Sequence, residues 1–168
     1  IIIMEHSYHG NSTLVHELSS LLYPSDECPD YVATVEPPNT YRGPYRTSQG
    51  LSDEQLGEKY ADLIDGAIEK LEKAGHGLAA FICDGIFDSQ GTLTAPSNYF
   101  QKVYEKVRAA GGICVADEVQ PGFGRLGDHM WGFEHYDVLP DIVTLGKPMG
   151  GGHPVAGGVA SKETAEAF

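Results

Sequence analysis

Two mainly apolar segments of the chain each end in a charged side chain. Residues 113–116 are followed by Asp117, and residues 141–145 lead through Gly146 to Lys147. Both segments are typical of buried strands that deliver a side chain to one edge of a sheet. A neighbouring amine and carboxylate are what pyridoxal phosphate chemistry requires, because the amine forms a Schiff base and the carboxylate keeps the pyridine nitrogen protonated.

Each of these residues also has an ordinary interpretation when it is taken alone. Lys147 precedes the glycine- and proline-rich residues 148–154, where a surface lysine in a turn is common. Asp117 alone could be a turn or helix-cap aspartate. A buried carboxylate is costly without a cationic partner, however, and a pyridinium N–H is such a partner. The pairing therefore favours a cofactor site over two separate structural roles.

Strand-length apolar runs predict the sheet that positions these residues. They cover residues 1–4, 31–35, 78–83, 113–116, 141–145 and 155–160. The runs are continuous rather than alternating, so we expect both faces of the sheet to be buried.

Helical spacing of apolar residues predicts two helices between the strands. The first covers residues 51–74 and begins with a capping box formed by Ser52 and Gln55. The second covers residues 97–110 and ends at Gly111. Alternating strands and helices predict an α/β fold with three layers, a mostly parallel sheet with helices on both faces. In such folds ligands bind at the carboxyl ends of the strands, where both charged residues fall.

Composition and charge restrict the class of protein. The 168 residues, 41% of them hydrophobic, are sufficient for one domain, residues 1–168. The net charge of −13 argues against nucleic acid or an anionic membrane as partner. Residues 1–4 are too short for a signal or membrane segment, and they resemble a core strand without a start Met. We therefore expect the chain to be a piece of a longer protein.

The cysteines and histidines predict neither disulfides nor a metal site. Cys28, Cys83 and Cys114 are odd in number and form no CxxC pair, which is typical of reduced thiols in a cytoplasmic protein. Three histidines lie near the start of the chain, but no carboxylate or cysteine completes a standard metal spacing around them. Residues 122–127 match GxGxxG, yet no long amphipathic helix follows, so no dinucleotide site is expected.

The residues around both charged positions resemble a known family. Residues 116–127, 140–147 and 152–154 are similar in order and spacing to the class III pyridoxal-phosphate-dependent aminotransferases of fold type I. The resemblance implies that Lys147 is the Schiff-base lysine and Asp117 the partner of the pyridine nitrogen.

Other cofactor contacts follow from the same resemblance. It implies that Val119 packs on the ring and that Gln120 lies near the ring hydroxyl. Residues 8–10 resemble the family segment whose aromatic residue stacks on the other ring face, which makes Tyr8 and His9 cofactor-binding candidates. Core packing is the alternative for Tyr8.

The resemblance also implies what lies outside this chain. It covers only the middle of such an enzyme, the large domain. The phosphate-binding loop is then expected before Ile1, and a small domain after Phe168. Family members are usually homodimers that act on a small-molecule amine or amino acid.

One segment departs from the ordinary family pattern. Relatives carry a Glu-Pro-x-Gln-Gly motif after the third strand, whereas residues 83–91 read Cys-Asp-Gly-Ile-Phe-Asp-Ser-Gln-Gly. Asp84 takes the place of the glutamate in this comparison. Together with Gly-Gly-His-Pro at residues 151–154, the segment resembles the phospho-lyase branch, which acts on phosphorylated amines such as phosphoethanolamine. Three functions stay open: an aminotransferase, a phospho-lyase, and a non-catalytic fragment that lacks the phosphate-binding part.

Overall fold

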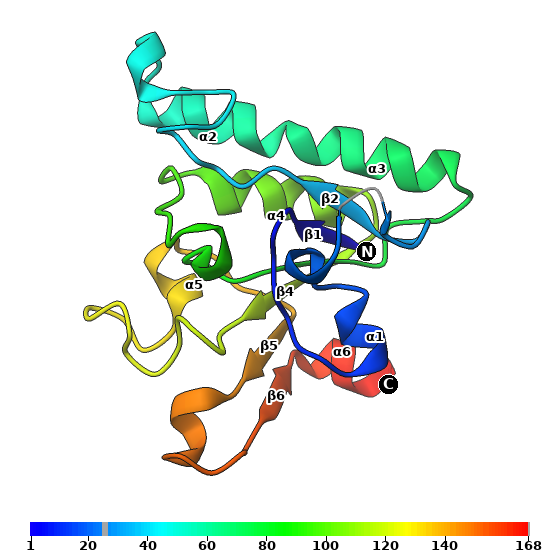
Figure 1. Ribbon diagram of the computed structural model, residues 1–168, viewed down its shortest axis with the longest axis vertical. Coiled ribbons are helices and arrows are strands. Elements are labelled where there is room, and N and C mark those ends of the chain that lie inside the picture. The colour runs from blue at the N-terminus through cyan, green and yellow to red at the C-terminus, as the bar shows by residue number, and fades with distance from the viewer. Residues whose placement is uncertain (25–26, 168) are drawn as a thin grey trace.

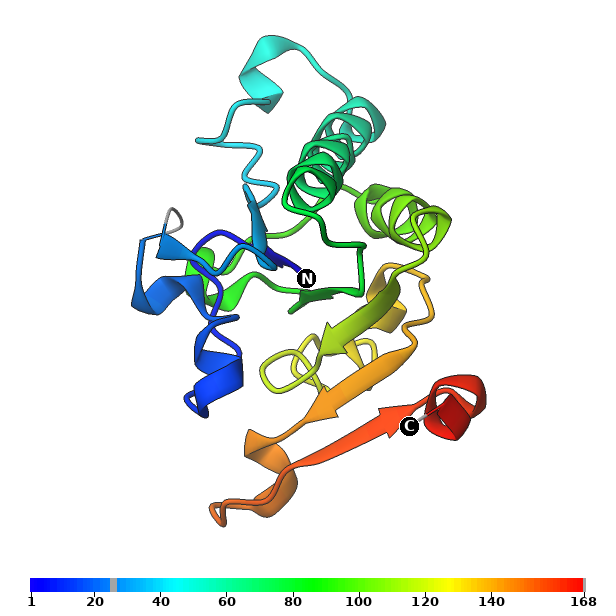
Figure 2. The same cartoon turned by 90° about the vertical axis from the view of Figure 1, so that its right-hand side faces the viewer.

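The strands of the chain form one sheet in a computed structural model, which describes residues 1–24 and 27–167. Its order is β2-β1-β3-β4-β5-β6; neighbours from β2 to β5 pair in parallel, and β6 pairs antiparallel with β5. The mostly parallel sheet predicted from the sequence is confirmed. The last three strands lie side by side in Figure 2. The bounds are β1 Ile2–Met4, β2 Ala33–Val35, β3 Ala80–Cys83, β4 Ile113–Asp117, β5 Ile142–Leu145 and β6 Gly157–Ala160.

Helices of very different length connect the strands (Figure 1). The α-helices are α1 Thr13–His16, α2 Asp53–Ala61, α3 Leu63–Lys73, α4 Tyr99–Ala109, α5 Gly132–His135 and α6 Lys162–Ala167. The 3-10 helices are η1 Ser20–Leu22, η3 Thr47–Gln49, η4 Asp88–Gln90 and η5 Lys147–Gly150. The sequence predicted only the regions of α2, α3 and α4, because helices of one turn or so are too short to show a hydrophobic period.

The helix predicted over residues 51–74 is interrupted, so its prediction as one element was wrong. It forms α2 and α3, which are separated by Asp62 with ψ at −19°. That angle is nearer to a 3-10 turn than to an α-helix, and aspartate is a poor former of helix interiors. The predicted capping box is confirmed: the Ser52 hydroxyl accepts from the Gln55 amide, and the Gln55 side chain accepts from the Ser52 amide.

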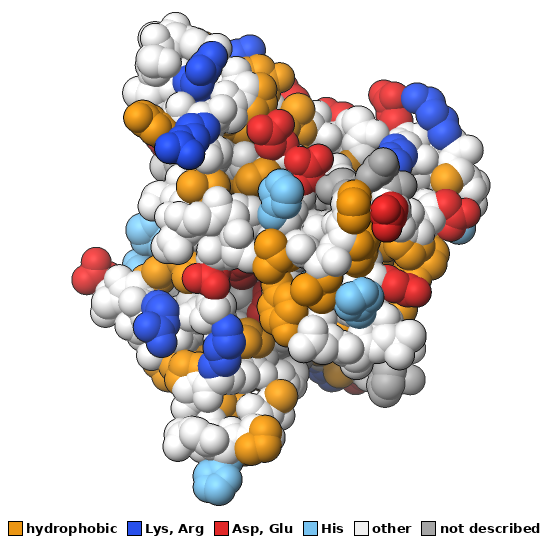
Figure 3. Space-filling view, viewed as in Figure 1, with side chains coloured by type: hydrophobic (Ala, Val, Ile, Leu, Met, Phe, Trp, Pro, Cys, Tyr) orange, Lys and Arg blue, Asp and Glu red, His pale blue; other side chains and the backbone are white. Residues whose placement is uncertain are grey.

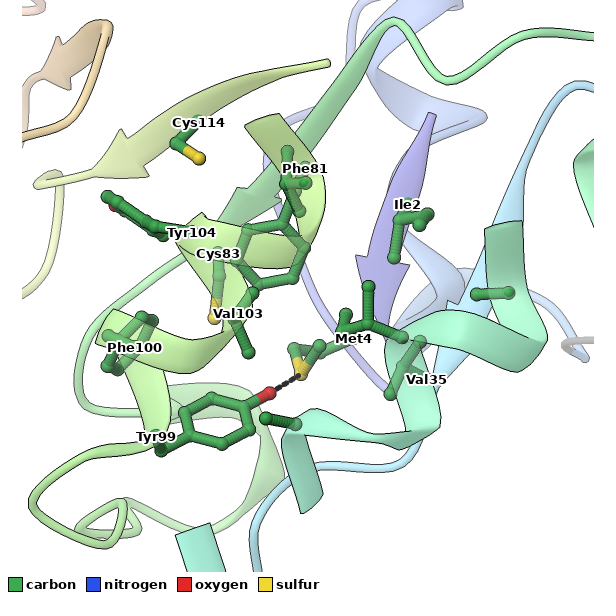
Figure 4. Close-up of a cluster of buried hydrophobic side chains, with 14 of the residues drawn as sticks. Ile2, Met4, Val35, Phe81, Cys83, Tyr99, Phe100, Val103, Tyr104 and Cys114 are labelled. Atoms are coloured by element: carbon green, nitrogen blue, oxygen red, sulfur yellow. Dashed lines mark hydrogen bonds between the residues drawn. The ribbon is translucent and has the colours of Figure 1, made fainter. Parts of the chain in front are cut away.

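Helices α2, α3 and α4 cover one face of the sheet and enclose the main core. Ile2, Met4 and Phe81 point from the strands into this layer, and Tyr99 and Val103 meet them from α4 (Figure 4). The Tyr99 hydroxyl lies 3.7 Å from the Met4 sulfur. Strands β1 and β3, beside the strands that carry the charged residues, are thus part of a well-packed layer.

The second face of the sheet is covered unevenly, which corrects the expectation that both faces are buried. Near β1, Ile3 packs with Leu18 and Val32 in a second, smaller cluster. At the edge of the sheet formed by β6, the strand is largely exposed, and Val159 retains 58% of its accessible surface. The continuous apolar runs were therefore a good guide to burial in β1 and a poor one in β6.

The surface of the chain is charged but mixed. Acidic and basic side chains are dispersed over the face shown in Figure 3, while hydrophobic side chains gather towards its middle. None of the helices formed by the described residues has the length and apolar content needed to span a bilayer.

Candidate active site

The parallel pairing of β4 and β5 brings the two charged residues to the same edge of the sheet. Asp117, the last residue of β4, is in register with Thr144, and Lys147 follows β5 after Gly146. This is the carboxyl edge of the parallel strands, where ligands bind in open α/β folds. The structure therefore places Asp117 and Lys147 where the sequence predicted.

Three donors hold the Asp117 carboxylate. Its Oδ1 accepts from the Val119 amide at 3.1 Å and from the Thr144 hydroxyl at 3.2 Å. Its Oδ2 lies 2.7 Å from His9 Nδ1, which must be the donor because a carboxylate only accepts. The exposed fractions of the His9 and Asp117 side chains are 2% and 8%. The carboxylate is thus fixed in orientation by groups from three separate segments.

Lys147 has a very different environment. It is exposed, and its φ of 38° lies in the left-handed region. Non-glycine residues enter this region uncommonly, at a cost of about 1–3 kcal/mol, and often at functional sites. Gly146 before it is buried and extended, with φ at −171°. The backbone conformation, rather than side-chain packing, sets the direction of Lys147.

Val119 lies against the strand that leads to the lysine. A Cβ placed on Gly146 would be 3.5 Å from both Val119 methyl groups. Val119 therefore lies close to the backbone immediately before Lys147.

A cavity of about 370 Å³ lies above this edge of the sheet and is lined by all six residues that the sequence predicted for the site. This volume falls within the usual range for small-molecule sites. The full lining consists of Tyr8, His9, Gly10, Leu21, Asp84, Asp88, Ser89, Asp117, Val119, Gln120 and Lys147. Residues far apart in the sequence thus share one concave surface.

The wall after β3 contributes acidic residues, of which the sequence had indicated only Asp84. The Gln120 side-chain amide donates to Asp88 Oδ2 at 2.7 Å, so Asp88 orients Gln120. Asp84 is buried, and its Oδ1 accepts from the amides of Ile86 and Asp88. Burial raises the pKa of Asp84 and nearby Asp117 adds to the rise, whereas the two amide bonds oppose it.

A simple signal could have found Asp88 and Ser89. Both lie a few residues after β3, at the same sheet edge as Asp117, so polar residues following each parallel strand are candidates for the site. Leu21 has no such signal, because it reaches the cavity from η1, an element too short to predict. Among the described residues, no group of three or more His, Cys, Asp or Glu side chains is arranged to hold a metal ion.

Comparison with known proteins places the whole chain in one family. The family model described as aminotransferase class-III matches residues 1–168. The chain is 44% identical over 171 residues to a Drosophila melanogaster protein named alanine–glyoxylate aminotransferase 2-like, covering all of this chain and 34% of the relative. It is 37% identical over 177 residues to ethanolamine-phosphate phospho-lyase homolog 1 of Caenorhabditis elegans, covering 99% of this chain and 38% of the relative.

Solved structures show the same two kinds of relative. A phospholyase from Arthrobacter in complex with phosphoethanolamine superposes with a TM-score of 0.85 at 37% identity, covering 99% of this chain and 39% of that one. A transaminase with L-alanine gives a TM-score of 0.83 at 25% identity, covering 98% of this chain and 38% of that one. The chain thus spans 34% to 39% of the length of these proteins.

Proposed function

The chain belongs to the class III aminotransferase family, and on that premise we propose that it carries the ring-binding half of a pyridoxal-phosphate-dependent aminotransferase site. The observation that carries the proposal is the position of Asp117 and Lys147 at neighbouring parallel strand ends, both lining one cavity. When bound, pyridoxal phosphate supplies an aldehyde that condenses with a lysine amine and a ring that draws electrons from the substrate.

The residues of the cavity fit this cofactor. Asp117 receives three hydrogen bonds, and since a carboxylate has about four acceptor positions, one is left for a ring N–H. Lys147 supplies an amine in the cavity. Tyr8 and Val119 offer an aromatic and an aliphatic surface for the ring, and Gln120 offers an amide for its hydroxyl.

In this proposal each residue has a distinct role. Lys147 holds the cofactor through its Nζ and then moves the proton at the substrate carbon. Asp117 holds a proton on the ring nitrogen. His9, which the sequence predicted as a cofactor-binding residue, donates from its Nδ1 to Asp117 and keeps that carboxylate oriented.

The direct test is chemical trapping on the protein itself. The protein is mixed with pyridoxal phosphate and reduced with borohydride, and the modified peptide is identified by mass spectrometry. We expect modification at Lys147 and none at Lys162, an exposed lysine of α6 that serves as an internal control. Modification elsewhere contradicts the assignment, and no modification at all supports the alternative of a non-catalytic fragment.

A phospho-lyase is the second candidate. It is favoured among the solved structures, whereas the 44% identity to the aminotransferase 2-like protein exceeds the identity to either phospho-lyase. Both the Caenorhabditis elegans phospho-lyase homolog and the Arthrobacter phospholyase are 37% identical to this chain, whereas the transaminase structure with L-alanine is 25% identical. Release of inorganic phosphate from phosphoethanolamine without an amino acceptor would support this activity. Formation of a keto product with the amino form of the cofactor would support transamination.

The homodimer implied by the resemblance belongs to the same proposal. The proposal concerns the full-length protein. Light scattering coupled to size exclusion measures its mass directly, and a monomeric mass at all concentrations would contradict the homodimer.

A further inference from the structure

Glu118 is a buried carboxylate that follows Asp117 directly and has no part in the proposed chemistry. It retains only 1% of its accessible surface. Its Oε2 accepts from the Gly132 amide at 2.7 Å and its Oε1 from the Phe133 amide at 3.0 Å. Hydrogen bonds to a carboxylate are stronger than neutral ones, and burial makes their loss more costly.

The two amides belong to the start of α5, far along the chain from β4. The first amides of a helix have no partner inside the helix. Glu118 satisfies two of them, and so ties the start of α5 to the end of β4. The intervening residues 119–131 form a closed loop.

The loop packs against Glu118 without spare room. A Cβ on Gly122 would lie 2.6 Å from the Glu118 carbonyl oxygen. A Cβ on Gly132 would lie 2.7 Å from the Pro121 Cβ and 3.1 Å from Glu118 Oε1. Real Cβ atoms essentially never approach other atoms as closely as 2.6 or 2.7 Å, so glycine is required at both positions for the present geometry.

The first residues of this loop line the cavity. Val119 and Gln120 follow Glu118 directly and both face the site. The Val119 amide donates to Asp117, and the Gln120 side chain donates to Asp88. Any shift of the loop would therefore move both side chains relative to Asp117.

We propose that Glu118 is a positioning residue that anchors the loop of residues 119–131 to the end of β4 and thereby fixes Val119 and Gln120 against the cofactor ring. The part that concerns the ring rests on the proposed function. Glu118 acts through the loop and touches neither cofactor nor substrate in this scheme.

Glu118→Gln tests the anchor with little change in volume, and Glu134→Gln is its matched control. Glu134 is an exposed carboxylate of the same helix whose Oε2 accepts from the Trp131 amide at 2.9 Å. Because glutamine has one acceptor oxygen for two amides, hydrogen exchange at Gly132 or Phe133 should accelerate about tenfold or more. Exchange at these two amides should be unchanged in Glu134→Gln.

The positioning role is tested by measuring the spectrum and affinity of bound pyridoxal phosphate rather than by measuring activity. In Glu118→Gln the visible circular dichroism of bound pyridoxal phosphate should change, and its dissociation constant should rise about tenfold. Faster amide exchange with unchanged dichroism and affinity would leave Glu118 a purely structural residue and overturn the proposal. Unchanged amide exchange would overturn the anchor itself.

If Glu118→Gln does not fold, a second variant changes the contact between Glu118 and the start of α5 at the helix instead. Gly132→Ala pushes against Pro121 Cβ of the loop and against Glu118 Oε1, and it leaves the Glu118 carboxylate in place, so it should reproduce the changes in exchange and dichroism. Gly66→Ala is the control, because a Cβ at Gly66 meets no atom within 4 Å. Normal dichroism and affinity in a folded Gly132→Ala protein would overturn the positioning role. Failure of the unmodified protein to bind pyridoxal phosphate would instead overturn the proposed function.

Discussion

The two strand ends that meet at the cavity are held in opposite ways. At the end of β4, Asp117 is 6% exposed and receives three hydrogen bonds. At the end of β5, Lys147 is exposed and its backbone is in the left-handed region. An acid that acts by its charge is most effective when it is fixed in advance. An amine that forms and breaks a bond and carries a proton has to move.

Replacing the exposed lysine should have the largest effect. Lys147→Ala should abolish the borohydride-trapped adduct with pyridoxal phosphate, because no other amine of the described residues lines the cavity. The free energy of unfolding should change by less than about 0.5 kcal/mol, as is usual for exposed side chains. Mass spectrometry and urea denaturation measure the two quantities.

A glycine at the same position separates backbone strain from chemistry. Lys147→Gly should lose the adduct as well, but it should be more stable than Lys147→Ala by about 1 kcal/mol, because glycine adopts a positive φ without strain. Equal stability of the two variants would show that the strain is absent, and a trapped adduct in either would refute the role of Lys147.

Replacing the fixed group should have the next largest effect. Asp117→Asn preserves shape but removes the charge that we propose holds the ring proton. Turnover should fall by about a thousandfold or more in the cofactor-loaded protein, while the fold is largely retained. Steady-state kinetics with a matched melting curve measure this effect. Asp128→Asn, a change on an exposed loop, is the control, and near-normal turnover in Asp117→Asn would refute the assignment.

The contrast between these two positions was only partly predictable from the sequence. Apolar runs ending in Asp117 and Lys147 located the sheet edge, because parallel strands place their carboxyl ends together. The donors to Asp117 were not evident, since His9 is 108 residues away and only the sheet order brings it close. The left-handed backbone at Lys147 was also hidden, because side-chain type indicates positive φ reliably only for glycine.

The limits of the fold prediction have related physical causes. The helical spacing of apolar residues predicted α4 and the region of α2 and α3. It could not show the interruption at Asp62, because that interruption is a change in one backbone dihedral angle. Continuous apolar runs could not distinguish β1, which is fully buried, from β6, which is mostly exposed, because burial depends on what covers the face.

Glycine substitutions should sharpen the comparison by separating packing from backbone conformation. On the β4 side, the new Cβ in Gly122→Ala would clash with the Glu118 carbonyl oxygen. The free energy of unfolding should fall by about 3 kcal/mol, the upper end of the usual cost of overpacking. On the β5 side, Gly151 has φ at 55° and open space around it, so Gly151→Ala should cost only about 1 kcal/mol of backbone strain.

Chemical denaturation of both variants measures the difference. Gly66→Ala, in the middle of α3 with no neighbour within 4 Å, is the control and should be neutral or slightly stabilising. Equal costs at Gly122 and Gly151 would contradict the view that packing holds one strand end and the backbone holds the other.

The smallest effect is expected in the pH dependence of stability, through Asp84 on the wall next to Asp117. Burial raises the pKa of Asp84 above its ordinary value of 3.8. The folded state therefore binds this proton more tightly than the unfolded state. The resulting contribution to stability is complete below pH 3.8 and is lost as the pH rises through the pKa of the folded protein.

Asp84→Asn should make this loss visible, because asparagine does not titrate and its carbonyl can still accept from the amides of Ile86 and Asp88. The free energy of unfolding of the variant, relative to the unmodified protein, should increase between about pH 4 and about pH 7. Ser89→Ala, in the same turn, adds or removes no titrating group, so its difference from the unmodified protein should be constant over this interval. A relative stability of Asp84→Asn that falls with pH would mean that its two amide bonds outweigh burial. The buried wall of the site would then stabilise the ionised carboxylate of Asp84.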